Sequence, residues 1–168
     1  MGRLVCALAV IAIGLSAAII VTTCVTLPPM VASHFAAGGA VSGYLPLDDY
    51  RALMLMLCVL PPAVILFSMT VGPRVFPGSI NVPNVRAWLA PPYRDETLDA
   101  LATRGALLAI VATLFIAGVH LLIVRANALS PPRLDAGALG LTVGAFVLAI
   151  VIWVVALLAR FRRPPGRR

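Results

Sequence analysis

Four long apolar runs without a charged side chain constrain this chain more than any other feature. They cover residues 4–27, 52–71, 106–124 and 138–158, and the first alone has 24 residues. A helix of about 20 apolar residues crosses the hydrocarbon core of a bilayer. With 61% apolar and only 11% charged residues, the chain has too little charge to cover a soluble domain. We therefore predict an all-α integral membrane four-helix bundle, one membrane domain over residues 1–168.

The segments between these runs predict two helical hairpins joined by a polar middle segment. Outer loops are expected at residues 28–51 and 125–137, a cytoplasmic loop at 72–105 and a basic cytoplasmic tail at 159–168. With four spans, both termini and the middle segment share one side, which then carries ten arginines against three on the other. Positive charge accumulates on the cytoplasmic side. We therefore expect a multi-pass protein of the cytoplasmic (inner) membrane with both termini in the cytoplasm.

Local signals refine two of the spans. Pro61-Pro62 lies near the middle of the second span and is expected to kink or break that helix. From about Tyr93 the pattern becomes helical, because Asp95 and Glu96 suit the first turn of a helix. We expect this helix to begin near the membrane surface and to run into the third span.

The predicted topology brings both histidines to the outer side. His120 falls near the outer end of the third span, and His34 falls in the first outer loop with Asp48 and Asp49. Asn127 shares a face with His120 if the helix continues that far, since the two are seven residues apart. Ionisable groups within a membrane are candidates for function, so one hypothesis is a small metal or proton site at the outer mouth. The alternative is structural: His34 holds the loop against the bundle, and His120 bonds to a neighbouring helix.

Signatures of catalysis are missing from the sequence. There is no HExxH, no glycine-rich phosphate loop, no Ser-His-Asp order and no carboxylate pair inside a span. The three cysteines, Cys6, Cys24 and Cys58, all fall in predicted spans and suggest no disulfide framework. We expect no cofactor, leave the identity of any metal open, and expect the basic tail to bind acidic lipid rather than nucleic acid.

Two ordered motifs resemble a known family. The first is an LP…HF…G…GY pattern in the first outer loop, formed by Leu27-Pro28, His34, Phe35, Gly38-Gly39 and Gly43-Tyr44. The second is an N-x-P-N…W-L-A-P…R-x-E-T pattern in the cytoplasmic loop, with Asn81, Pro83, Asn84, Trp88, Pro91, Arg94, Glu96 and Thr97. Together they resemble bacterial and archaeal membrane proteins with domain of unknown function 1648. That domain also occurs near the amino end of immunity proteins against the sporulation-delaying toxin. The resemblance implies the fold and topology rather than an activity.

The sequence leaves three functional hypotheses. The first is a non-catalytic sensor, partner subunit or immunity-like binder, whose outer His34 loop meets a peptide or ion and whose residues 81–97 meet a cytoplasmic protein partner. The second is a transporter or ion-handling subunit that uses the Pro61-Pro62 break and His120. The third is a metal-dependent membrane enzyme, which needs His34 and His120 within joint reach of one ion.

Overall fold

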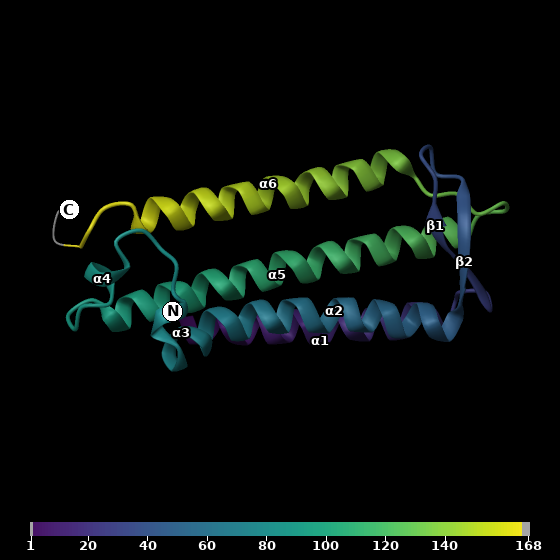
Figure 1. The fold of residues 1–168 in the computed structure, drawn as a ribbon. Coiled ribbons are helices and arrows are strands. Elements are labelled where there is room, and N and C mark those ends of the chain that lie inside the picture. The colour runs from purple at the N-terminus through teal and green to yellow at the C-terminus, as the bar shows by residue number, and fades with distance from the viewer. Residues whose placement is uncertain (1, 166–168) are drawn as a thin grey trace.

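The computed structural model describes residues 2–165 and contains four helices long and apolar enough to cross a membrane. These helices lie side by side (Figure 1) and are α1 (Gly2–Cys24), α2 (Leu47–Thr70), α5 (Arg94–Asn127) and α6 (Ala136–Phe161). The predicted four-helix membrane fold is therefore confirmed. Both ends of the described chain lie at one end of the bundle (Figure 1). We call this the arginine end, and we call the opposite end, which carries a β-hairpin, the hairpin end.

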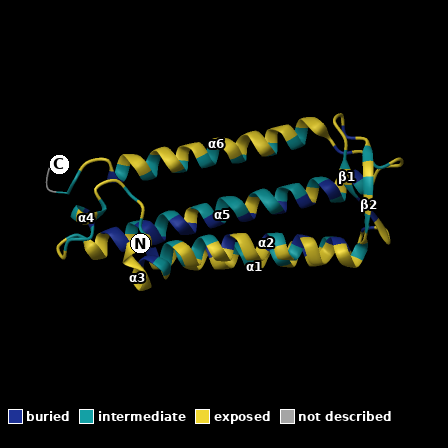
Figure 2. Ribbon diagram, viewed as in Figure 1, coloured by how far each residue is buried: buried dark blue, intermediate teal, exposed yellow. Residues whose placement is uncertain are grey.

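Helices α1, α2 and α5 form the packed core of the molecule. Toward the arginine end, Ala9 of α1 meets Ala106 and Ala109 of α5, and all three are fully buried. Gly105 lies so close to α2 that a Cβ there would stand 2.4 Å from the Cβ of Met69. Small residues allow this approach, since helices in lipid associate by close packing rather than by the hydrophobic effect. Figure 2 shows that buried residues gather along α5 while the outer helix faces stay exposed.

Helix α6 lies at the edge of the bundle and packs mainly against α5. Within α6 only Phe161, its last residue, is buried. In the membrane part, the rings of Phe115 and Phe146 stack with centroids 4.2 Å apart, and Trp153 Nε1 donates to the Arg104 carbonyl at 2.8 Å. The fourth span is therefore open to lipid along most of its length.

Helix α2 differs from the prediction at two points. It is continuous from Leu47 to Thr70, with Pro61 and Pro62 inside it, so the expected break does not occur. The proline pair removes two N–H donors, whereas a break would free about four N–H and four C=O groups at the new helix ends. In lipid those groups find no water, and continuing the helix is the cheaper solution. The helix also begins five residues before the predicted span, because Asp48 and Asp49 form its first turn rather than a loop.

The first outer loop folds into a two-stranded antiparallel hairpin, which the sequence did not predict. Strands β1 (Met30–Phe35) and β2 (Val41–Pro46) pair with Val31 opposite Leu45. The turn lies at Gly38 and Gly39, whose φ angles of +87° and +85° favour glycine. The hairpin crosses the end of the bundle (Figure 1).

The polar middle segment crosses the arginine end as three short helical pieces, two of which contain a proline in their first two residues. They are α3 (Gly72–Val75), the 3-10 turn η1 (Pro77–Ser79) and α4 (Val85–Trp88). Helix α5 then begins at Arg94 and runs through the third span to Asn127, so the expected extended helix is confirmed. Asp135 is the N-cap of α6. Its carboxylate accepts a hydrogen bond from the Ala138 N–H at 2.9 Å.

Candidate functional site

His120 is fully buried where α1, α2 and α5 meet near the hairpin end. Its Nε2 lies 2.6 Å from Thr23 Oγ1 of α1, and its Nδ1 lies 2.9 Å from the Tyr50 hydroxyl of α2. The Tyr50 and His120 rings also stack, with centroids 5.9 Å apart and planes 24° from parallel. One side chain thus ties the three core helices together.

The neighbours of His120 fix its tautomer. Thr23 Oγ1 also lies 2.6 Å from the Ile19 carbonyl oxygen, which can only accept. The Thr23 hydroxyl therefore donates to Ile19, and its oxygen accepts from Nε2–H of His120. That leaves Nδ1 to accept from the Tyr50 hydroxyl. A neutral imidazole is satisfied on both nitrogens, so neither is left for a metal ion.

Asn127 lies seven residues after His120 on the same helix, which continues that far as expected. Its Oδ1 accepts from the Ala32 N–H at 2.8 Å, and its Nδ2 donates to the Ala32 carbonyl at 3.0 Å. A second Nδ2 bond, to the Ile123 carbonyl at 2.9 Å, fixes the side chain on α5. Asn127 therefore pairs with β1 as a neighbouring strand would, and attaches the hairpin to the bundle.

The connection between α5 and α6 holds the hairpin from a second side. The Leu134 N–H donates to the Gly39 carbonyl at 2.9 Å, and Ala40 forms a bridge with Arg133. A Cβ on Gly39 would lie 2.0 Å from the Leu134 carbonyl oxygen. The hairpin is thus fixed at its first strand and at its turn.

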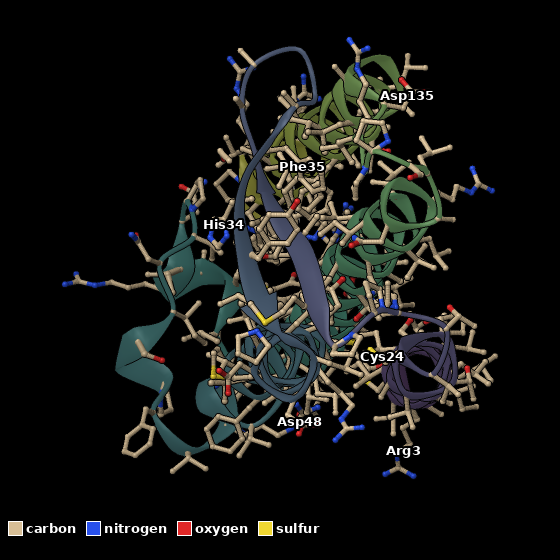
Figure 3. The ribbon with its side chains drawn as sticks, turned by 90° about the vertical axis from the view of Figure 1, so that its right-hand side faces the viewer. Arg3, Cys24, His34, Phe35, Asp48 and Asp135 are labelled. Carbon is tan, nitrogen blue, oxygen red and sulfur yellow. The ribbon has the colours of Figure 1, made fainter. Side chains whose placement is uncertain are left out.

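His34 lies on the exposed surface of the hairpin and does not share the environment of His120. Its Nδ1 lies 3.0 Å from Ser33 Oγ, and it sits on the side of the hairpin facing away from α5 (Figure 3). Gly43 lies beneath it, since a Cβ there would be 3.3 Å from the Cβ of His34. Among residues 2–165, no group of three or more His, Cys, Asp or Glu side chains is placed to hold a metal ion. The two histidines therefore form no joint site in the structure.

The remaining outer candidates belong to the scaffold. Asp48 pairs with Arg51 at 2.7 Å one turn along α2, and Asp49 is exposed beside it. Phe35 packs half-buried against the core cluster beneath the hairpin. Gly38 forms the turn and has open space where a Cβ would lie.

The hairpin has two unlike faces. Val31 is fully buried in the core cluster beneath the hairpin, while Met30, His34 and Tyr44 are exposed, Met30 and Tyr44 by 52% and 51%. We call Met30, His34, Ser42, Tyr44 and Pro46, all exposed, the hairpin face. Its side chains contribute little to the fold, so the fold does not explain why a tyrosine and a histidine stand there.

At the arginine end, side chains of the second motif donate hydrogen bonds to the carbonyl groups at the C-terminal end of α6. Asn84, left-handed at φ 58°, donates from Nδ2 to the carbonyls of Phe161 at 3.2 Å and Arg162 at 3.0 Å. Trp88 Nε1 also donates to the Phe161 carbonyl, at 3.3 Å. The final carbonyls of a helix lack intrahelical partners, and this motif supplies them. Its asparagine and tryptophan thus have a structural role.

The other end of that motif anchors the start of α5. Thr97, fully buried, donates from Oγ1 to the Trp88 carbonyl at 2.9 Å. The Arg160 guanidinium lies 4.6 Å from the Trp88 ring centroid and forms an ion pair with Glu96. Four further motif residues are exposed, namely Asn81, Pro83, Pro91 and Arg94. The motif surface at this end thus consists of these four with the exposed Asn84 and Glu96, whereas Trp88 and Thr97 are buried.

The sequence did not point to the partners that complete these clusters. Thr23, Tyr50, Arg160 and Phe161 each contact a residue 64 to 97 positions away in the chain. A weak signal exists for Tyr50, because the predicted topology puts the start of the second helix and the end of the third on one side. Thr23 carries the same weak signal, because the end of the first predicted span lies on that side too.

A scan against protein-family models, a search of curated proteins and a search of solved structures each found no match. The resemblance to proteins with domain of unknown function 1648 therefore stays a prediction. The hairpin gives its first motif a structural meaning: His34-Phe35 ends β1, Gly38-Gly39 makes the turn and Gly43-Tyr44 lies in β2.

Proposed function

We propose that this chain is a non-catalytic binding or accessory subunit of the cytoplasmic membrane, and that the hairpin face is the surface it presents to a protein or peptide ligand outside the cell. The observation that carries the proposal is the contrast within the hairpin. Its backbone is fixed by Asn127 and Leu134, while Met30, His34 and Tyr44 stand exposed. Ordering a surface in advance lowers the entropic cost of binding.

The residue types of the hairpin face suit recognition. Tyrosine is enriched at interfaces because its ring offers a large apolar area and its hydroxyl offers a hydrogen bond. Methionine adapts to irregular partner surfaces. The histidine adds donor and acceptor nitrogens. This mixture fits a polypeptide ligand better than a lone ion.

The proposed orientation of the protein in the membrane follows from the distribution of its arginines. The arginine end carries both described ends of the chain and the middle segment (Figure 1), and eight of the eleven described arginines belong to these parts. The positive-inside rule then puts that end in the cytoplasm and the hairpin outside. The two alternative functions depended on a break in α2 and on joined histidines, whereas α2 is continuous and His34 and His120 have different partners.

Site-specific photo-crosslinking in intact cells tests the proposal. A photoreactive amino acid at Tyr44 is expected to give a discrete protein adduct. The same amino acid at exposed Phe76, at the arginine end, gives a different pattern and serves as the control. Replacing both Met30 and His34 by serine removes only exposed side chains, so the adduct should weaken without loss of the protein. Lipid adducts alone at position 44, or an adduct that ignores the serine substitutions, would contradict the proposal.

A further inference from the structure

A groove runs between α5 and α6 on the membrane surface of the bundle. Its membrane part has a volume of about 390 Å³ and an almost entirely apolar lining, formed by Val111, Leu114, Phe115, Thr142, Ala145, Phe146 and Ala149. At the arginine end, a second hollow of about 450 Å³ is lined by Glu96, Asp99, Ala100, Thr103, Arg104 and Arg160. Both hollows open because α6 packs on α5 through few side chains.

The two hollows lie along the same faces of α5 and α6. On α5, the lining residues Ala100, Arg104, Val111 and Phe115 follow one another at steps of four, seven and four. Such steps keep side chains on one face of a helix. On α6, Ala149 and Arg160 are eleven residues apart, or about three turns, and also share a face. The two hollows therefore lie along one α5–α6 seam, with Trp153, which donates to the Arg104 carbonyl at 2.8 Å, between them.

The charge at the end of the groove is positive. A third hollow, of about 580 Å³, adjoins it and is lined by Ala159, Arg160, Arg162 and Arg163. Together the two charged hollows present four arginines, Arg104 included, against the acids Glu96 and Asp99. Glu96 is already paired with Arg160. An anionic group thus meets an excess of guanidinium donors.

One of these donors lacks an acceptor. Arg160 Nη2 pairs with Glu96, whereas Arg160 Nη1 is buried without a hydrogen-bond partner in residues 2–165. A buried donor left unpaired is costly, and a guanidinium more so than a neutral group. Because Nη1 is buried, the guanidinium must turn to reach an oxygen of a bound anion, which would then satisfy it with a strong charge-assisted bond.

The dimensions fit a membrane lipid. At 1.5 Å per residue, Ala149 lies about 16 Å along α6 from Arg160, close to the depth of one leaflet, about 15 Å. Trp153 lies between them on α6. Basic pockets between transmembrane helices bind acidic headgroups. We propose that the α5–α6 groove binds one anionic phospholipid, with its phosphate at Arg160, Arg162 and Arg163 and an acyl chain along the apolar hollow toward Ala149.

Native mass spectrometry of the full chain in detergent tests this site. The probes are phosphatidylglycerol and phosphatidylcholine with the same acyl chains, and inorganic phosphate. We expect one phosphatidylglycerol to be retained per chain and to bind about tenfold tighter than phosphatidylcholine, the effect of about one charge-assisted hydrogen bond. Arg160→Gln should abolish that preference. Arg86→Gln, an equal charge change at an exposed site of the same end, should leave it intact.

A second variant keeps the test decisive if Arg160→Gln disturbs the fold through its contacts to Glu96 and Trp88. Ala149→Phe fills the apolar hollow and touches no arginine. It should weaken retention of both lipids and leave the chain as stable as the wild type without lipid. Equal retention of the two lipids, equal effects of Arg86→Gln and Arg160→Gln, full retention by Ala149→Phe, or an effect of inorganic phosphate equal to that of phosphatidylglycerol would each overturn the proposal.

Discussion

Removing the Asn127 side chain should release the hairpin from the bundle. Asn127→Ala deletes the two hydrogen bonds to the Ala32 backbone, at 2.8 and 3.0 Å, that join α5 to β1. Each bond contributes about 1 kcal/mol net, so hairpin opening becomes about 2 kcal/mol easier. Since 1.4 kcal/mol is about tenfold, amide exchange over residues 30–46 should rise about 30-fold. Exchange within residues 9–20 of α1 should stay unchanged.

Hydrogen exchange measured by mass spectrometry on the protein in lipid nanodiscs gives this number directly. Thr26→Ala is the matched control, because it removes a side-chain bond at the same end, from Thr26 Oγ1 to the Thr23 carbonyl at 2.8 Å, that joins no two elements. The reasoning is refuted if hairpin exchange in Asn127→Ala stays within about twofold of the control.

Three further substitutions test the packing. In thermal unfolding, Gly39→Ala should destabilise the hairpin end far more than Gly38→Ala. Both glycines have positive φ, but only a Cβ at Gly39 would meet the backbone, 2.0 Å from the Leu134 carbonyl oxygen. Equal effects of the two substitutions would contradict this prediction. Gly105→Ala should separate α2 from α5 and lower the unfolding temperature. Gly14→Ala, with open space at its Cβ, should leave the unfolding temperature unchanged. An unchanged unfolding temperature in Gly105→Ala would show that the contact between α2 and α5 is loose. Tyr50→Phe removes one buried interhelical bond and should cost about 0.6 to 1.7 kcal/mol in a denaturant titration in detergent; no loss would mean that the histidine does not hold α2.

The spans were predictable because lipid leaves the backbone few choices. An uncharged run of about 20 residues must be helical to satisfy its own hydrogen bonds. Helix α5 begins beside its acids as expected, and it ends at Asn127, three residues beyond the predicted span. The start of α2 was missed because Asp48, Asp49 and Arg51 resemble a loop in composition. In the structure the two acids lie at the positive end of the helix dipole, and Asp48 pairs with Arg51.

The hairpin escaped prediction because its stability is not local. A two-stranded hairpin alone is marginal in water, and β1 carries register shifts at Ala32, His34 and Phe35 that weaken its alternating pattern. The contacts that fix it come from Asn127, 95 residues from Ala32 along the chain, and from Leu134. Sequence reasoning located Asn127 on the correct helix face but could not assign its partner.

For the two histidines, too, the sequence predicts the end of the bundle but not the partners. The sequence predicts both histidines on the outer side and leaves open whether they form one site or occupy separate structural positions. The structure gives His120 the interhelical role, through partners 97 and 70 residues away, and leaves His34 exposed on the hairpin face. Helix order and direction predict which end a residue occupies, whereas the rotation of each helix, which decides its partners, depends on packing throughout the bundle.

The central claim of this account is that the hairpin faces the outside while the arginine end faces the cytoplasm. Cysteine accessibility tests it most directly, in a background where the three native cysteines are replaced by alanine. Ser42→Cys and Ser79→Cys are matched changes at exposed serines of the hairpin and of η1. A membrane-impermeant maleimide should label Ser42→Cys in intact cells and Ser79→Cys only after permeabilisation. Labelling of Ser79→Cys, but not Ser42→Cys, in intact cells would reverse the topology and contradict the account.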